Sequence, residues 1–272
     1  MAGIEVAHYL VWSRTWEALA RQSPLRQRDV QDRLIEFFRT LCRQLEPTVV
    51  LEIGAHEATF SRWAAESLPT AHVRAFEANP HVYEKYAAEL ATCRLEYRNL
   101  AVGGMTGEVQ LNLPTAIAGR ERSLTSRMAS LAPHTESADN IHVTVPSVRL
   151  DDYLSLAPGE TGVAWIDVEG ANKDVLEGCG SLLDRLQAIF IEVEKQTTWE
   201  GQWLDTDVNT FLRDRGLVAV ARDFFVKKRA HQYNVVFVRA SIARLRQTAG
   251  LAAKVLAPPI HQQRRHPWRR RS

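Results

Sequence analysis

Apolar and polar residues follow two patterns along the chain, one typical of strands and one typical of helices, and together these predict an α/β protein. Short apolar segments rich in β-branched residues predict strands near residues 48–53, 72–77, 96–101, 108–113, 142–148, 163–168, 188–193, 217–222 and 234–239. Amphipathic segments predict helices near residues 58–67, 80–91, 172–184, 206–215 and 241–254. Because strands and helices alternate early in the chain, we expect a doubly wound, mostly parallel sheet with an antiparallel C-terminal edge.

A further helix is predicted before the first strand. Residues 29–45 place an apolar stripe on one helical face, and Pro47 marks the end of that helix. The stripe consists of Val30, Leu34, Phe37, Phe38, Leu41 and Leu45. We therefore divide the chain into an N-terminal helical extension (1–46), an α/β domain (47–240) and a C-terminal helix with a tail (241–272). The extension is a candidate for a cover over the binding site or for a homodimer contact.

Residues 114–140 form a long polar segment without sustained periodicity. Segments of this length inside compact domains are lids, binding loops or disordered regions. We favour a lid over disorder, because the segment lies between predicted core strands and not at a terminus. Within it, Ser123, Thr125, Ser126 and Arg127 are candidates for contacts with a polyhydroxylated or anionic ligand, and a solvated polar loop is the alternative.

Composition narrows the class of protein. Of the 272 residues, 45% are hydrophobic and 24% are charged, which is typical of a soluble globular protein with ample material for a core. Cys42, Cys93 and Cys179 lie far apart, and Cys42 and Cys179 fall at apolar helix positions, so we expect those two to be buried free thiols. This cysteine usage suits a reducing cytoplasm, and we expect neither a signal peptide nor a transmembrane segment.

Positive charge is concentrated at the C-terminus. The formal net charge of the chain is +2, but residues 264–272, RRHPWRRRS, hold five arginines and no acid. We expect a solvated tail, with peripheral contact to an anionic membrane surface or to nucleic acid as the alternative. Because the rest of the chain is not basic, nucleic acid is not expected to be the main partner.

Three acidic residues stand at the ends of predicted parallel strands: Glu52, Glu77 and Asp167. In an open α/β sheet, ligands bind outside the carboxyl ends of the strands, near the switch in strand order. Glu77 follows Glu52 by 25 residues, which is about the distance from a glycine loop to the acid that holds a ribose. The loop after the first strand contains a single glycine, Gly54, where nucleotide-binding loops usually carry two or three.

Five segments carry a more specific signal: LEIGAHEATFS, AFEANP, VRLDDYL, AWIDVEGANKDVLEG and FIEVE occur in this order. Together they resemble the FkbM-type methyltransferases, which have the class I, Rossmann-like S-adenosylmethionine-dependent fold. The resemblance covers about residues 48–240. It implies S-adenosylmethionine as the cofactor and O-methylation of a hydroxyl on a sugar, glycolipid or secondary metabolite, so the partner would be a small-molecule or glycan acceptor.

The resemblance also implies roles for residues of the first motif. Glu52, Gly54 and Ala55 match the segment that surrounds the methionine end of the cofactor. His56 stands where the family commonly has asparagine, and Ala58 where it commonly has glycine. We assign His56 to the same binding segment, and we expect Ala58 to fit without strain at the start of a helix.

The later motifs imply the remaining contacts. Glu77 matches the acid that binds the ribose, and Ala101 and Val102 fall where the family has its adenine-side segment. Asp167 matches the aspartate beneath the transferred methyl group, and Glu169 follows it in the same motif.

Methyl transfer to an alcohol calls for a base or a Lewis acid near the acceptor. We expect Asp167 to be the base or the group that orients the hydroxyl, with Glu169 second and His56 as a further candidate. Alternatively, Asp167 and Glu192 could hold Mg²⁺, which would lower the pKa of the hydroxyl. Each of these side chains could instead be structural.

Two tryptophans are further candidates for the site. Trp199 and Trp203 are candidates for the wall of an acceptor site, with plain packing as the alternative.

Two other functions are alternatives. An oxidoreductase that binds NAD would also place an acid at the ribose, but the second and third fingerprint glycines are absent. A non-catalytic methyltransferase-fold scaffold or binding module is the alternative from another class.

Overall fold

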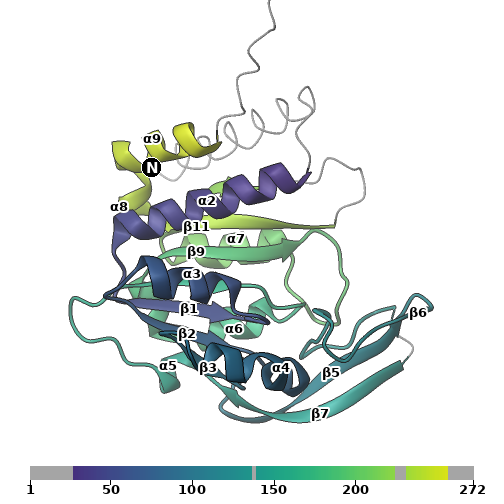
Figure 1. Ribbon diagram of the computed structural model, residues 1–272. Helices are drawn as coiled ribbons and strands as arrows, with labels where there is room; N and C mark the ends of the chain where they lie inside the picture. The colour runs from purple at the N-terminus through teal and green to yellow at the C-terminus, as the bar shows by residue number, and fades with distance from the viewer. Residues whose placement is uncertain (1–26, 137–138, 224–230, 257–272) are drawn as a thin grey trace, which may run out of the picture.

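The computed structural model describes residues 27–136, 139–223 and 231–256. Its centre is a seven-stranded sheet with the order β10-β11-β9-β8-β1-β2-β3 (Figure 1). The strands are β1 (Val49–Ile53), β2 (His72–Phe76), β3 (Glu96–Arg98), β8 (Gly162–Ile166), β9 (Leu186–Glu194), β10 (Leu217–Arg222) and β11 (Gln232–Arg239). Strands β3, β2, β1, β8 and β9 are parallel, whereas β11 is antiparallel to both of its neighbours. The mostly parallel α/β fold is thus confirmed, with the antiparallel strand one place inside the edge.

Strand β1 determines where a ligand can enter the sheet. It pairs with β2 on one side and with β8 on the other, so the sheet extends from β1 in both directions. The crevice outside the carboxyl ends of β1 and β8 is therefore the switch point of the sheet. Side chains alternate along the strand, so Val49, Leu51 and Ile53 pack on one face while Val50 packs on the other.

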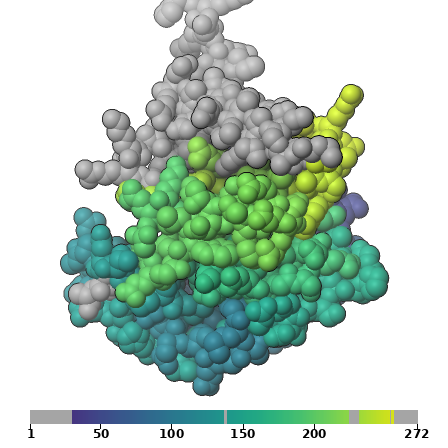
Figure 2. Space-filling view, turned by 180° about the vertical axis from the view of Figure 1, so that it is seen from behind, coloured from purple at the N-terminus to yellow at the C-terminus, as the bar shows by residue number. Residues whose placement is uncertain are grey.

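Helices cover both faces of the sheet. One core cluster joins the sheet to α2 (Gln27–Leu45), α3 (Thr59–Ser67) and α9 (Arg246–Leu256). The other face packs against α5 (Leu150–Tyr153), α6 (Asn172–Gly178) and α7 (Asp205–Asp214). Helix α4 (Pro80–Leu90) follows β2, and α8 (Ala240–Ala243) follows β11. Seen from behind, the green segment that contains α7 covers the middle of the molecule, above the blue and teal segments (Figure 2).

Helix α2 belongs to the main core. The predicted apolar stripe is buried in the cluster that also holds α3 and α9, except for Leu45, which is partly buried against it. The part of the predicted N-terminal extension that the structure describes is therefore a layer of the domain itself. Residues 1–26 of that extension and the predicted basic tail (264–272) lie outside the described residues.

A second sheet follows the first three strands of the chain. It has the order β4-β7-β5-β6 and is formed by β4 (Ala101–Val102), β5 (Gly107–Ile117), β6 (Arg120–Glu121) and β7 (Asp139–Val148). The single strand predicted at 96–101 is wrong, because the chain leaves the central sheet at Asn99. Its side-chain amide donates to the carbonyl oxygens of Glu77 (2.8 Å) and Ala78 (3.1 Å), so β3 and β4 join different sheets.

Two predicted helices are divided in the structure. The helix expected at 172–184 ends at Gly178 and continues as a 3₁₀-helix from Gly180 to Arg185. A Cβ on Gly178 would lie 2.0 Å from the carbonyl oxygen of Gly103, and Gly180 has a φ of +43°. The glycines therefore allow a close approach and a turn that an uninterrupted helix would forbid. The helix expected at 241–254 is likewise divided into α8 and α9.

The remaining expectations concern cysteines and membranes. Cys42 and Cys179 are buried as predicted, and burial raises the pKa of both thiols; Cys93 is half-buried. Within the described ranges, no helix combines the length and apolar character that crossing a membrane requires.

Candidate active site

The loop between β1 and α3 lies at the switch point and has an unusual backbone. Gly54, His56 and Ala58 all adopt positive φ angles, of +76°, +47° and +53°. Glycine accepts this conformation freely, whereas a residue with a Cβ loses about 1–2 kcal/mol there. The expectation that Ala58 fits without strain is therefore wrong, because Ala58 is left-handed just before the helix starts.

Gly54 is also required for space. A Cβ at this position would lie 2.0 Å from the carbonyl oxygen of Asp167, which is backbone and cannot give way. The loop after β1 thus touches the end of β8 directly, through main-chain atoms only. The N–H groups of Gly54 and Ala55 both donate to the carbonyl oxygen of Phe76, which ties the same loop to β2 (3.0 and 2.9 Å).

Glu52 supports this loop from below and does not line the cavity. Its carboxylate accepts the backbone N–H groups of Phe60 (3.2 Å) and Ser61 (2.7 Å) in the first turn of α3. The alternation along β1 directs the side chain toward this helix. Burial raises the pKa of Glu52 to about 7, although both hydrogen bonds favour the charged form. Glu52 therefore fixes α3 to the strand, and Ala55 is buried beside it.

Glu77 follows β2 and faces the cavity. Its two carboxylate oxygens accept the backbone N–H groups of His56 and Asn79, both at 2.7 Å. Asn79 in turn accepts the N–H of His81 and so caps α4. The side chain of Glu77 is only 7% exposed, and burial raises its pKa to about 6. Glu77 is thus held rigidly, with lone pairs left for further donors.

A cavity of about 380 Å³ lies outside the carboxyl ends of β1, β2 and β8. This volume falls in the range of small-molecule sites. Of the residues predicted for the site, the cavity is lined by Gly54, His56, Glu77, Ala101, Val102, Asp167, Glu169 and Glu192. The structure brings these residues together from five separate segments, whereas Glu52 and Ala55 are buried and do not line the cavity.

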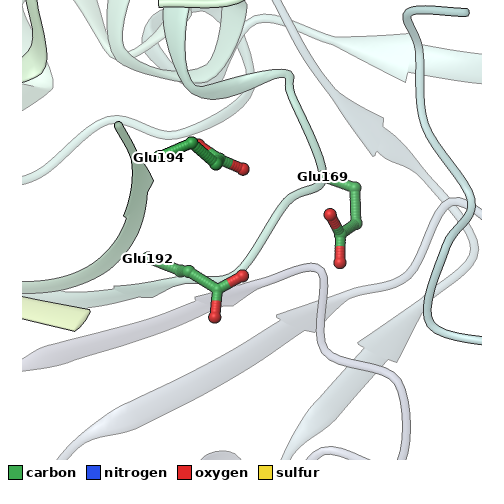
Figure 3. A group of neighbouring side chains, drawn as sticks. All are labelled: Glu169, Glu192 and Glu194. Atoms are coloured by element: carbon green, nitrogen blue, oxygen red, sulfur yellow. The ribbon is translucent and has the colours of Figure 1, made fainter. Parts of the chain in front are cut away.

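Acidic side chains gather at one end of this cavity. Asp167 directly follows β8, Glu169 comes two residues later, and Glu192 and Glu194 stand two residues apart on one side of β9. The carboxylates of the three glutamates converge on a common space (Figure 3). One oxygen from each lies within 4.8 Å of the others.

Burial and mutual repulsion govern the protonation of this group. Desolvation, followed by repulsion from neighbouring carboxylates, raises the pKa of Glu169 and of Glu194 to about 8. The same two causes raise the pKa of Glu192, and burial raises that of Asp167. Four acids of one sign in one buried place resist ionisation unless positive charge joins them.

The acidic group has few hydrogen-bond donors. The side-chain amide of Gln232, on β11, donates to Glu192 Oε1 (2.8 Å), and the side-chain amide of Asn172 donates to the main-chain oxygen of the same residue (2.8 Å). Glu194 is 2% exposed, and its Oε2 has no hydrogen-bond partner among the described residues. Buried carboxylate oxygens without a partner are costly, so this arrangement calls for a functional explanation.

The predicted lid covers the cavity and is fastened on both sides. On the side of Glu77, the carbonyl oxygen of Leu124 accepts the side-chain amide of Asn79 (2.7 Å), and Arg127 pairs with Glu57 (3.2 Å). On the opposite side, the hydroxyl of Ser130 donates to the carbonyl oxygen of Glu169 at 2.5 Å.

Only the middle of the lid is irregular. Residues 114–117 belong to β5, and residues 139 and 140 belong to β7. Ser126 and Arg127 line the cavity, whereas Ser123 and Thr125 lie in the same turn without lining it. The predicted contacts of these four residues with an acceptor stay a prediction.

His56 connects the loop after β1 to the lid. Its Nε2 lies 3.2 Å from the carbonyl oxygen of Thr125, which can only accept, so Nε2 carries the hydrogen. The other ring nitrogen, Nδ1, is buried without a hydrogen-bond partner in the described chain, and it lies 3.9 Å from Glu57. Burial lowers the pKa of His56, which keeps the ring neutral. This geometry makes His56 a contact that positions the lid, and its role as a general base stays a prediction.

The two candidate tryptophans pack inside the protein. Trp199 is fully buried, its ring meets His134 edge to face at 4.8 Å, and a Cβ on Gly170 would lie 2.4 Å from its Cγ. Trp203 packs on Phe211 at 4.9 Å. Neither indole lines the cavity, so the structure supports the packing alternative. His134 and Trp199 also join the lid to the segment after β9 through an isolated β-bridge.

Sequence reasoning missed several residues of the site. Glu194 lies in the quoted FIEVE segment, and the period of two along a strand could have placed it beside Glu192. Tyr97 donates its hydroxyl to the carbonyl oxygen of His56 (2.6 Å) and holds the strained loop, whereas Gln232 and Ser130 act through contacts between distant segments. No local pattern identifies such contacts.

Comparison with known proteins decides the family. Residues 52–218 match the methyltransferase FkbM domain, a span that contains the loop after β1, the lid and the acidic group. The chain belongs to the FkbM methyltransferase family. The resemblance found in the five sequence segments is thus confirmed.

One curated relative is the 2-O-methyltransferase NoeI of Sinorhizobium fredii (strain NBRC 101917 / NGR234). It is 25% identical to this FkbM protein over 162 residues, which cover 57% of this chain and 66% of NoeI. The match therefore spans just under two thirds of the relative's length.

Two solved structures show a low similarity. The methyltransferase FkbM from Methylobacillus flagellatus KT has a TM-score of 0.43 and 11% identity, over 71% of this chain and 44% of that chain. Magnesium protoporphyrin IX methyltransferase from Synechocystis PCC 6803 with bound SAM also has a TM-score of 0.43, with 10% identity, over 77% and 79% of the two chains. At this level neither contributes to the assignment of the site.

Proposed function

We propose that this FkbM protein transfers a methyl group from S-adenosylmethionine to a hydroxyl of a sugar, glycolipid or secondary metabolite. The observation that carries the proposal is the placement of Glu77 and Asp167 around one cavity at the switch point of the sheet. The loop that contains Gly54 lies between them, since β1 lies between β2 and β8. The name of NoeI, a 2-O-methyltransferase, supports oxygen as the acceptor atom.

The residues of the cavity fit the proposed cofactor. Glu77 presents a fixed carboxylate that can accept both hydroxyls of a ribose, because its two backbone donors leave lone pairs free. Ala101 and Val102 give an apolar wall suited to an adenine ring. Gly54 lets the loop after β1 pack directly against the backbone of Asp167, which brings two cavity-lining segments together.

Within this mechanism, S-adenosylmethionine supplies an electrophilic methyl group on its sulfonium. The chain binds the ribose with Glu77 and holds the acceptor hydroxyl near Asp167, at the end of β8. Asp167 accepts the hydroxyl proton or orients it, with Glu169 as the second candidate. The lid, fastened at Asn79 and at Ser130, excludes water from the cavity. His56 contributes by holding the lid, through its contact with Thr125.

Calorimetric titration with S-adenosylmethionine tests the cofactor assignment. We expect one site per chain, and we expect Glu77→Ala to weaken binding by at least about 10-fold, because a buried hydrogen-bonded carboxylate is lost. Glu177→Ala, which changes an exposed glutamate of α6, is the control. A folded wild-type protein that does not bind this cofactor would favour the scaffold alternative and overturn the proposal.

Turnover of an Asp167→Asn variant tests the base. With a labelled-methyl assay against a panel of glycans and extracts, we expect its rate to fall by about 10²–10⁴-fold while cofactor binding persists. Undiminished turnover would exclude Asp167 as the base. Mass spectrometry of the product identifies the acceptor and the methylated position.

A further inference from the structure

We propose that Glu169, Glu192 and Glu194 bind one divalent cation at the acceptor end of the cavity. The proposal rests on the proposed function only for the use of that cation, because the site itself is argued from the three side chains. It differs from the pair considered from the sequence, Asp167 and Glu192, because the carboxylates that converge most closely belong to the three glutamates.

The first argument is geometric. The three carboxylates approach one space from different directions, Glu169 from the loop after β8 and the other two from β9 (Figure 3). One oxygen of each lies within 4.8 Å of the others. A cation with ligand distances of about 2.4 Å spans such a separation, and small rotations of the side chains suit the shorter bonds of about 2.1 Å that Mg²⁺ prefers. An all-oxygen ligand set selects Mg²⁺, Mn²⁺ or Ca²⁺.

The second argument is independent of the clustering. Glu194 is 2% exposed, it points into the group, and its Oε2 has no hydrogen-bond partner in the described part of the chain. A side chain that only packed would place this oxygen against a donor or in solvent. A buried carboxylate that converges with two others and keeps an oxygen without a donor is placed as a ligand.

The charge balance points the same way. Among the residues that the structure describes, no arginine or lysine forms an ion pair with any of the three glutamates. Asp167 lines the same cavity and adds a further carboxylate beside them. A dication would compensate this accumulation of negative charge, whereas nearby carboxylates alone repel one another.

Supporting contacts hold the ligands in place. Gln232 donates to Glu192 Oε1, and the buried side chain of Asn172 fastens the main chain of Glu192 to α6. Such second contacts orient metal ligands and raise affinity. Glu169, Glu192 and Gln232 line the cavity, whereas Glu194 lies behind it, so the open coordination positions would face the acceptor.

In the proposed reaction, the cation would bind the acceptor oxygen and lower the pKa of its hydroxyl. The hydroxyl proton passes to Asp167, the oxygen forms a bond to the methyl carbon, and the electrons of the broken carbon–sulfur bond stay on sulfur. The products are the methyl ether and S-adenosylhomocysteine, and no further reactant is needed.

Titration of the purified full-length chain with Mn²⁺, without cofactor or acceptor, tests the site. We expect one Mn²⁺ per chain by calorimetry and by electron paramagnetic resonance, with competition by Mg²⁺ or Ca²⁺. Glu192→Gln and Glu194→Gln each remove a ligand with little change of shape, and we expect each to weaken binding at least about 100-fold. Glu177→Gln, the same change on the exposed side of α6, should bind Mn²⁺ as the wild type does.

Two further measurements keep the test decisive. Gln232→Leu leaves all three ligands but removes the donor to Glu192, and we expect it to weaken Mn²⁺ binding about 10-fold. Thermal unfolding with and without Mn²⁺ verifies that each variant folds, and titration with S-adenosylmethionine is expected to be unchanged in all of them. A wild type that binds Mn²⁺ but does not bind S-adenosylmethionine would overturn the proposed function and leave the cation site intact.

Three results would overturn the cation site. The first is a folded, cofactor-binding wild type with no stoichiometric Mn²⁺. The second is unchanged Mn²⁺ binding in Glu192→Gln or Glu194→Gln. The third is turnover that resists chelators and needs an acceptor bearing an amine, which would show that the three carboxylates recognise a cationic substrate instead.

Discussion

The site has two halves, one around β1 and β2 and the other around β8 and β9, and they use the same residue type in opposite ways. On the side of β1 and β2, Glu52 and Glu77 are buried, and each accepts two backbone N–H groups. On the side of β8 and β9, Glu194 is equally buried but leaves a carboxylate oxygen without a partner in the described chain. Burial alone therefore does not distinguish a supporting acid from a ligand-binding one; the number of donors around it does.

Helix placement explains the difference. Strands β1 and β2 are each followed within a few residues by a helix of nine or more residues. The first turn of α3 donates to Glu52, whereas Glu77 accepts the N–H of Asn79, the N-cap of α4, and that of His56 in the loop after β1. Strand β9 instead runs into a long loop before α7 begins at Asp205. The acids at the end of β9 thus receive no donors from a helix and depend on what binds there.

The largest expected effect comes from a side-chain atom added where the loop after β1 contacts the chain at the end of β8. Gly54→Ala places a Cβ against the carbonyl oxygen of Asp167 at a positive φ, so we expect a loss of about 3–4 kcal/mol in the free energy of unfolding and no measurable cofactor binding. Urea unfolding and calorimetry measure both. Gly119→Ala is a matched control, because Gly119 has a similar φ of +72° but nothing within 4 Å of the added atom.

The protonation of Glu52, in the supporting half, should appear in the pH dependence of the unfolding free energy. The pKa of Glu52 is raised to about 7, so the folded protein binds more protons than the unfolded chain between the ordinary glutamate pKa and 7. Stability from this group is present at low pH and falls as pH rises through this window, by about 3 kcal/mol at 1.36 kcal/mol per unit. We expect Glu52→Gln to flatten the fall in unfolding free energy between pH 5 and 8, and an unaltered slope would contradict the assignment.

The next test exchanges one acid from each half for glutamine. Glu77→Gln turns one acceptor into a donor facing a backbone N–H, so we expect a loss of about 1–3 kcal/mol. Glu194→Gln removes a carboxyl group that burial and neighbouring carboxylates make hard to ionise, so in metal-free buffer we expect the melting temperature to stay equal or rise. Equal destabilisation by the two changes would show that the halves do not differ as described.

The smallest effect concerns strain in the supporting half. Ala58→Gly relieves a left-handed alanine, worth about 1–2 kcal/mol, but it removes a buried methyl group worth about 0.8 kcal/mol and adds chain entropy. We expect stabilisation of less than about 1 kcal/mol by urea unfolding. A loss above about 1 kcal/mol would mean that packing outweighs strain at this position.

Most of the fold could be predicted from the sequence, because apolar runs and periodicity record which faces are buried. Acids that end parallel strands, such as Glu77 and Asp167, were predictable for the same reason, since strand ends share one edge of the sheet. The break at Asn99 was not, because it depends on side-chain bonds to carbonyls across the turn. The left-handed backbone at Ala58 was also missed, since nothing local to an alanine indicates a positive φ.

The second sheet has a consequence for how acceptor choice can diversify. Strand β4 forms the proposed adenine wall and pairs with β7, while the lid continues from the ribbon of β5 and β7. The connection between these strands can lengthen, shorten or be exchanged without altering any pairing of the central sheet. We therefore expect a segment grafted between family members to change acceptor preference when the graft keeps the contacts of the lid to Asn79 and Glu169.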